Sequence, residues 1–297
     1  MTSTTRVLTI AALIGLGAAA SALGQDHPER PAATPPPAPS PARSIEPVRI
    51  ETADDLLRAL ETADAGLETL TADIRYTRDF GAIEGGERQV WEGSLFFDAS
   101  LETAGAPRRG FAVVFRKSIV NNQVRDEERA FIFDGEWFVE KVPAEKQMIR
   151  RRVVPPGEVA DPLKIGEGPF PIPIGQRRED ILRRFTVELR PAAAGLEGEE
   201  SNQRFVAGTY QLRLVPRAGT DEAREFREVL LWYRASDLMP RMARTVNADE
   251  GRAEVKLINH RMTQPLPGGV FDTAPPPRSA GWDVQTQEWR GKDDNRR

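Results

Sequence analysis

Apolar and polar residues alternate along several stretches of this chain, and this pattern restricts the fold more than any other feature. Between residues 70 and 77 every second residue is apolar, and the alternation returns around 91–97, 111–115 and 131–133. Successive side chains of a β-strand point to opposite faces of the sheet, so each stretch is predicted as a strand with one apolar face. That face must be covered, either because the sheet curls or because helices lie over it.

The same pattern predicts further strands at 185–189, 210–215, 229–233, 242–246 and 253–258. A helix is predicted at 53–67, because Thr52 and Asp55 form a capping-box pattern and apolar residues then recur at helical spacing. Residues 153–176 are dense in proline and glycine and are predicted as a long loop, which leads into a short helix at 179–185. With a polar loop at 197–202 and a hairpin connection at 236–240, the order of elements predicts an α+β fold with one large antiparallel sheet.

The N-terminal residues are typical of an export signal. Arg6 is followed by an uncharged run that ends in Ala22-Leu23-Gly24, which predicts a cleaved signal peptide over residues 1–24. Residues 25–48 are rich in proline and alanine and are expected to form a disordered spacer. One domain over 49–285 and a polar tail over 286–297 complete the predicted organisation, that of a soluble protein secreted across the inner membrane.

Composition argues against several kinds of site. The 297 residues include no cysteine and two histidines, and the net charge of −4 comes from interspersed charges of both signs. We therefore expect no disulfide, no metal, no cofactor, no nucleic-acid partner and no enzymatic activity. His260 shares its phase with Glu254 and Lys256, which predicts a solvent-facing side chain. The basic run at 150–152 is compatible with contacts to phosphates or acidic head groups and equally with a solvated strand end.

The apolar phases of the predicted strands carry many aromatic side chains. Each fits an ordinary core, and together they suit a hydrophobic cavity. The residues predicted to line a hydrophobic ligand cavity are Ile74, Tyr76, Trp91, Leu95, Phe97, Phe111, Val113, Phe115, Phe131, Phe133, Trp137 and Val139. The helix at 53–67 and the segment 170–185 are predicted to form a lid over it, with the residues Leu56, Leu60, Leu67, Phe170, Ile181 and Leu182.

Asp134-Gly135 is followed by the aromatic residues Trp137 and Phe138 and then by Pro143 and Gln147. With this motif the chain resembles, from about residue 50 to residue 284, the periplasmic lipoprotein carrier LolA and its relatives. A strand pair of that family turns at Asp-Gly, continues through aromatic residues and reaches a proline and then a glutamine. Leu231-Trp232-Tyr233 with Ser236-Asp237 and Pro240 is similar to the late hairpin of the family, and residues 270–276 are similar to its final strand.

The resemblance implies a strongly curved, unclosed antiparallel β-barrel whose concave hydrophobic face is covered by helices. It also implies a monomeric periplasmic carrier that receives an acylated lipoprotein, or another lipid, from an inner-membrane exporter and delivers it to an outer-membrane acceptor. Arg108 and Arg109 are the candidates for the functional arginine of the family. Two alternatives stay open: a periplasmic sensor of lipids or lipoproteins with the same fold, and a periplasmic hydrolase, which would need a cluster of polar residues inside the hollow.

Overall fold

A computed structural model describes residues 49–80, 87–103, 106–155, 158, 170, 172 and 174–289. All of them belong to one compact unit that begins at residue 47. The predicted signal peptide, the spacer and most of the proline- and glycine-rich loop lie outside the described residues.

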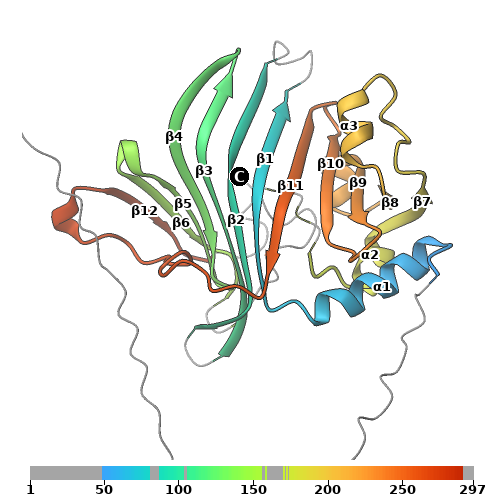
Figure 1. The fold of residues 1–297 in the computed structure, drawn as a ribbon. Helices are drawn as coiled ribbons and strands as arrows, with labels where there is room; N and C mark the ends of the chain where they lie inside the picture. The colour runs from blue at the N-terminus through green and yellow to red at the C-terminus, as the bar shows by residue number, and fades with distance from the viewer. Residues whose placement is uncertain are drawn as a thin grey trace, which may run out of the picture. The chain divides into compact units, whose positions relative to one another are not determined.

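One sheet of 12 strands dominates this unit, and its long strands bend along their length (Figure 1). The order across the sheet is β12-β6-β5-β4-β3-β2-β1-β11-β10-β9-β8-β7, so β12 and β7 form its two edges and the sheet is unclosed. The strands are β1 (Thr69–Asp79), β2 (Arg88–Thr103), β3 (Ala106–Val120), β4 (Gln123–Phe133), β5 (Trp137–Val142), β6 (Gln147–Arg152), β7 (Phe185–Arg190), β8 (Thr209–Pro216), β9 (Phe226–Arg234), β10 (Pro240–Asn247), β11 (Arg252–Met262) and β12 (Asp283–Gln287).

The helices are short apart from the first. They are α1 (Ala53–Ala65), α2 (Arg178–Arg184), α3 (Glu200–Phe205) and α4 (Glu222–Glu225), with 3-10 turns at Pro143–Glu145 and Arg278–Ala280. The predicted capping box is present, because Thr52 Oγ1 accepts a hydrogen bond from the Asp55 N–H at 3.1 Å and the Asp55 carboxylate accepts from the Thr52 N–H at 3.0 Å. The polar loop predicted at 197–202 was wrong in part, because α3 begins at Glu200.

The strand register shows that one apolar face runs across most of the sheet. Directly paired residues of an antiparallel sheet share a face. Ile74 pairs with Leu257, Tyr76 pairs with Val255, and Val255 pairs in turn with Ala243. From Ala243 the same face continues through Leu231 to Leu212. We call the face that carries these side chains the inner face and the opposite one the outer face.

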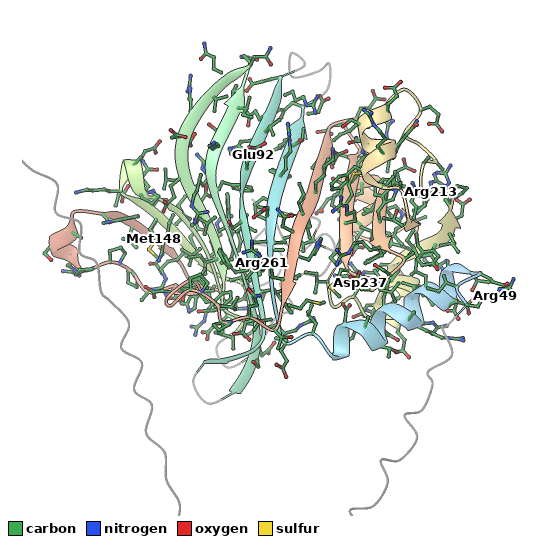
Figure 2. The ribbon with its side chains drawn as sticks, in the orientation of Figure 1. Arg49, Glu92, Met148, Arg213, Asp237 and Arg261 are labelled. Carbon is green, nitrogen blue, oxygen red and sulfur yellow. The ribbon has the colours of Figure 1, made fainter. Side chains whose placement is uncertain are left out.

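The outer face is covered at one end by the C-terminal segment. There Ile132, Val139 and Met148 are buried under Leu266, Val270, Phe271, Trp282 and Val284, and Met148 of β6 is labelled in Figure 2. The strand expected at 270–276 is absent, because Gly268 to Phe271 form turns and the following prolines have no N–H to give a ladder. Instead β12 pairs with β6, and this pairing is parallel, against the antiparallel expectation. It also places Thr286 and Gln287 in the sheet, beyond the boundary predicted at 285.

At the other end, α3 is held on the outer face by a buried cluster of charges. The Arg244 side chain is 8% exposed, and its guanidinium donates to Glu199 at 2.5 and 3.0 Å and to Glu254 at 2.6 and 3.1 Å. Burial alone would raise the pKa of the Glu199 carboxyl, but hydrogen bonds from Arg244 and Asn202 hold this pKa below its ordinary value. The cluster ties the residue that precedes α3 to β10 and β11.

His260 is half-buried, so the prediction of a solvent-facing side chain was wrong. Asn259 and His260 together stand opposite the single residue Ala72, and Asn259 has a φ of 54°. This β-bulge changes the phase of the strand after Ile258. His260 Nε2 consequently lies 2.7 Å from the Pro240 carbonyl oxygen, while Nδ1 is buried without a partner among the described residues.

We expect the protein to lose stability as the pH falls from 7 to 5, in part through His260. Burial lowers the pKa of this imidazole, against the hydrogen bond with the Pro240 carbonyl, which raises it. The unfolded chain therefore binds a proton at a higher pH than the folded one, and this contribution is lost as the pH falls through the folded pKa. Urea unfolding at several pH values should show a shallower pH dependence for His260→Gln. If the unfolding free energies of the wild type and His260→Gln changed with pH in parallel, His260 would not contribute to the loss of stability.

Among the residues that the structure describes, no helix combines the length and the apolar character that crossing a membrane requires.

Candidate functional site

The predicted cavity residues gather on the inner face of β1 to β4, with two exceptions. Ile74, Leu95, Phe97, Phe111, Val113, Phe115 and Phe133 belong to one buried cluster, and Tyr76, Trp91 and Phe131 pack against it. Their rings are in mutual contact: Tyr76 stacks on Trp91 with centroids 5.6 Å apart, and Phe111 stacks on Phe133 at 6.0 Å. These strands therefore present a continuous aromatic and aliphatic surface to whatever covers them.

Trp137 and Val139 lie on the outer face, so their assignment to the cavity was wrong. The Asp134 N–H donates to the Trp137 carbonyl, which makes the connection between β4 and β5 a two-residue turn. In this register Phe133 pairs with Phe138, and Ile132 pairs with Val139. Phe138 therefore takes the inner position, and Trp137 and Val139 pack under the C-terminal segment.

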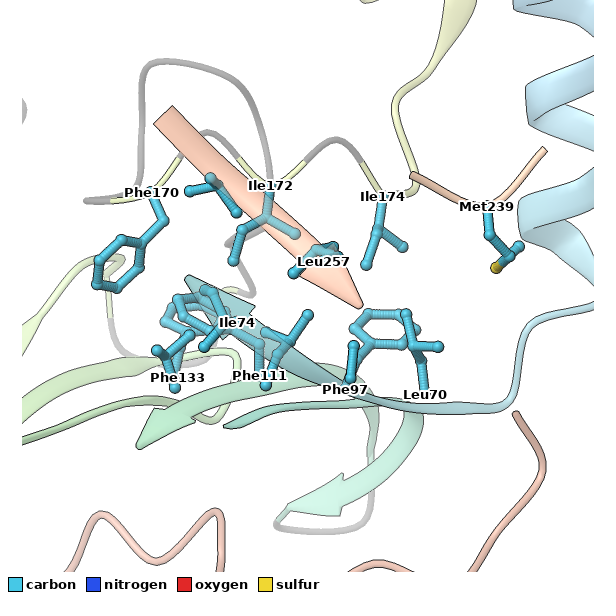
Figure 3. Packing of buried hydrophobic residues seen from close by; sticks show 14 of the residues in the cluster. Leu70, Ile74, Phe97, Phe111, Phe133, Phe170, Ile172, Ile174, Met239 and Leu257 are labelled. Carbon is cyan, nitrogen blue, oxygen red and sulfur yellow. The ribbon is translucent and has the colours of Figure 1, made fainter. Parts of the chain in front are cut away.

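Among the described residues, three that belong to neither a helix nor a strand lie over this aromatic surface. Phe170, Ile172 and Ile174, which we call the cover residues, are 8%, 1% and 0% exposed. Figure 3 shows them above the sheet, with their side chains pointing toward those of the strands below. The Phe170 ring meets Tyr76, Phe115 and Phe131 edge-on at centroid distances of 5.1 to 5.6 Å. These three side chains thus occupy space over β1 to β4.

The helices of the predicted lid lie over the other half of the inner face. Leu56 and Leu60 of α1 and Ile181 of α2 are buried with residues of β7 to β10, and Leu182 packs against the same cluster. Leu67, just after α1, and Phe170 belong instead to the cluster over β1 to β4. Ile172 and Ile174 lie in the predicted lid segment 170–185 but were not named among its residues, although the three apolar residues stand at every second position in the loop.

Gly175 fastens the end of the cover residues to two different elements. Its N–H donates to Asp64 Oδ2 of α1 at 2.7 Å, and its carbonyl oxygen accepts from Arg109 Nη1 of β3 at 3.4 Å. Arg109, one of the two candidate arginines, also lies over the Phe97 ring, with its Cζ 5.3 Å from the centroid. Gly175 has a φ of +70°, and a Cβ at this position would collide with the Arg109 guanidinium.

Past Gly175 the chain is tied again to α1. The Arg178 N–H donates to Glu61 Oε1 at 2.7 Å, and Arg178 Nε donates to Asp54 Oδ1 at 2.5 Å. These polar contacts hold the two ends of α1 against the start of α2. The cover residues themselves are held to the sheet by apolar contacts, which an apolar ligand can replace.

The polar chemistry within this site is sparse. Burial raises the pKa of the Tyr76 hydroxyl and thereby keeps it neutral, although the charge of nearby Arg78 lowers this pKa. Within the described part of the chain, no group of three or more His, Asp or Glu side chains is placed to hold a metal ion. The arrangement favours binding of an apolar group.

A scan against protein-family models finds no match, and a search of the curated proteins finds none either. Among solved structures, the chain is similar to an uncharacterized conserved protein from Thermus thermophilus, with 12% identity, 80% of this chain and 99% of that chain covered, and a TM-score of 0.39. The complex of MucA and MucB from Pseudomonas aeruginosa gives 14% identity, 81% and 65% coverage and a TM-score of 0.37. A LolA superfamily protein from Nitrosomonas europaea is 10% identical, with 75% of this chain and 99% of that chain covered and a TM-score of 0.33. These similar structures include a member of the superfamily that the sequence resembles.

Proposed function

We propose that this protein is an exported, non-enzymatic carrier that binds an acyl chain on the inner face of its sheet, in the place taken by the cover residues. The observation that supports this most directly is the cover itself. Three apolar side chains from a segment outside the sheet and the helices rest on an aromatic surface and are fastened at Gly175. An acyl chain offers that surface the same kind of contact.

The magnitudes fit a ligand that binds and is released. Exposing one phenylalanine and two isoleucines costs about 5–9 kcal/mol, at 1.5–3 kcal/mol for each side chain. Burying an acyl chain of about 16 carbons contributes roughly 12 kcal/mol. The difference of about 3–7 kcal/mol corresponds to dissociation constants between roughly 10 µM and 10 mM. A carrier needs such an offset, because a chain held with the full free energy of burial would not leave.

The cargo proposed is an acylated lipoprotein or a lipid, moved through the periplasm from an inner-membrane exporter to an outer-membrane acceptor. The predicted signal peptide supports the compartment. The proposed role also requires that the cover open without unfolding the sheet. The polar contacts at Gly175 and Arg178 lie at one end of the cover residues and are compatible with such a local opening.

Native mass spectrometry of the protein isolated from the periplasm of its own host tests this function. We expect an added mass that tandem fragmentation identifies as an acylated molecule. Purified protein should also bind a dansyl-labelled long-chain alkyl amide with an increase and a blue shift of dansyl fluorescence. Absence of both signals at probe concentrations up to its solubility would reject the proposal.

Replacing Gly175 by alanine should increase uptake of this probe. Alanine at a φ of +70° costs about 1 kcal/mol, and its Cβ displaces Arg109 from the carbonyl that it holds. The closed cover is destabilised by the strained backbone and by the loss of the Arg109 contact, so the apparent affinity for the alkyl probe should rise about fivefold or more. Fluorescence titration measures this change.

Gly208→Ala is the matched control. Gly208 has a φ of +73°, and an added Cβ would meet no atom within 4 Å. It precedes β8, which lies in the other half of the sheet from the strands under the cover. Both variants should lose about 1 kcal/mol of global stability. Equal uptake by the two would show that Gly175 does not fasten the cover.

A further inference from the structure

A groove on the outer face, separate from the aromatic surface of the inner face, has the features of a second binding site. It has a volume of about 710 Å³, within the range of small-molecule sites. One wall is formed by Trp137 of β5 and Arg150 of β6, which the register places on the outer face. The other wall is the C-terminal segment, with Leu266 and Phe271 contributing apolar surface.

The carboxylates that line this groove already accept hydrogen bonds from the protein. Asp134 is 7% exposed and accepts from the N–H groups of Glu136 and Trp137 at 3.0 and 2.8 Å and from the Thr273 hydroxyl at 2.6 Å. Asp98 accepts from Ser100, and Glu136 is paired with Arg152. None of these carboxylates needs a cationic ligand.

Arg150 is in the opposite situation. Its Cζ lies 4.0 Å from the centroid of the Trp137 ring, and its Nε is buried without a hydrogen-bond partner. Within the described part of the chain it forms no ion pair, whereas Arg152, whose Cζ also lies over this ring, is paired with Glu136 and Glu288. A guanidinium that is partly desolvated and lacks an anion gains most from a carboxylate, which it can bind with two parallel hydrogen bonds.

A second cation stands close to Arg150. Lys141 Nζ donates to the Asp272 carbonyl oxygen at 2.8 Å, which ties β5 to the C-terminal segment. Burial lowers the pKa of the Lys141 ammonium group. The charge of Asp272 raises this pKa, and the charge of Arg150 lowers it. The two cations therefore repel each other, and an anion at Arg150 would relieve this repulsion.

We propose that this groove binds a small monocarboxylate with a flat apolar body, whose carboxylate pairs with Arg150 and whose body packs between Trp137 and Phe271. A single negative charge fits better than two, because Asp98, Asp134 and Glu136 line the same groove and would repel a phosphate dianion. The aromatic wall selects for an apolar body of the size of one ring. This site lies on the opposite face of the sheet from the cover residues and does not depend on the acyl-chain proposal.

Calorimetric titration of the full mature protein at pH 7 with 3-phenylpropanoate tests the site. We expect binding with a dissociation constant below about 1 mM. The neutral 3-phenylpropanamide, which keeps the body and removes the charge, should bind at least about tenfold more weakly, as should phenyl phosphate. Titration of ¹⁵N-labelled protein should move the amide resonances of Glu136, Trp137 and Gly269.

Arg150→Gln should weaken binding of the carboxylate at least about tenfold. Arg151→Gln is the matched control, since Arg151 is exposed and pairs with Phe138, which places it on the other face of the same strand. It should bind as the wild type does. The proposal is overturned by equal binding of carboxylate and amide to the wild type, by tighter binding of phenyl phosphate, or by no resonance shifts up to about 10 mM ligand. The wild-type comparison of carboxylate with amide decides the matter even where Arg150→Gln does not fold.

Discussion

Replacing Ile172 by alanine should make the protein bind acyl chains more tightly and at the same time make it less stable. Ile172 is one of the cover residues and is 1% exposed, and truncating such a side chain costs the closed state about 2–4 kcal/mol. In the proposed ligand-bound state this side chain has left the sheet, so the loss falls on the closed state alone. A difference of about 3 kcal/mol corresponds to an affinity roughly 100-fold higher for the alkyl probe.

Leu257→Ala separates this mechanism from a general loosening of the core. Leu257 is also 1% exposed and belongs to the same cluster, but it lies on β11 and forms part of the surface on which the cover residues rest. Its truncation should lower stability by a similar amount, yet it removes surface that the ligand needs, so affinity should fall. Affinity changes of the same sign in the two variants would exclude the cover residues as the opening element. Stability is compared by urea unfolding, and affinity by dansyl fluorescence.

The strands were predictable because their side chains obey a single local rule. Where β2 pairs regularly with both β1 and β3, over residues 93–98, the residues Ile74, Leu95 and Phe111 share the inner face as their alternation requires. The late hairpin of β9 and β10 follows for the same reason. Alternation is retained in the sequence wherever one face of a strand is buried.

The errors arose where the parity of the pairing changes. A two-residue turn at Gly135 and Glu136 places Phe133 opposite Phe138. Odd-numbered residues near this turn therefore lie on the inner face in β4 and on the outer face in β5. Counting on from Phe133 to Trp137 therefore gave the wrong face. The bulge at Asn259 moves His260 by the same kind of step. Neither the length of a turn nor a bulge follows from the apolar pattern alone.

The cover of the site could be predicted only in part. The helical spacing of Leu56 and Leu60 indicates a helix with one buried face but not which half of the sheet it covers. Ile172 and Ile174 lie in a segment without regular structure, and their burial depends on long-range contacts with β1 to β4. The groove at Arg150 is likewise built by the C-terminal segment, whose turns leave no periodic pattern in the sequence.

Replacing Arg244 by methionine should destabilise the protein by about 3–5 kcal/mol at pH 7, the largest effect that we expect from a single change on the outer face. Methionine fills a similar volume but leaves Glu199 and Glu254 close together without the guanidinium that both of them contact. Breaking a buried pair by removing one partner costs this much because the remaining charges are desolvated and uncompensated. Urea unfolding at pH 7 gives the difference.

The pH dependence of that loss distinguishes charge from packing. In the wild type the pKa of Glu199 is held below its ordinary value, so its contribution is present above the unfolded pKa and is lost as the pH falls through the folded one. Without Arg244, desolvation and repulsion by Glu254 raise the pKa of the Glu199 carboxyl in the folded state, and the folded variant then gains from protonation. The two stability curves should converge as the pH approaches about 4. Arg213→Met, at a pair with Glu228 whose arginine is 35% exposed, should cost less than about 1 kcal/mol at pH 7. A deficit in Arg244→Met that is constant with pH would assign the effect to packing and refute the electrostatic account of how α3 is held.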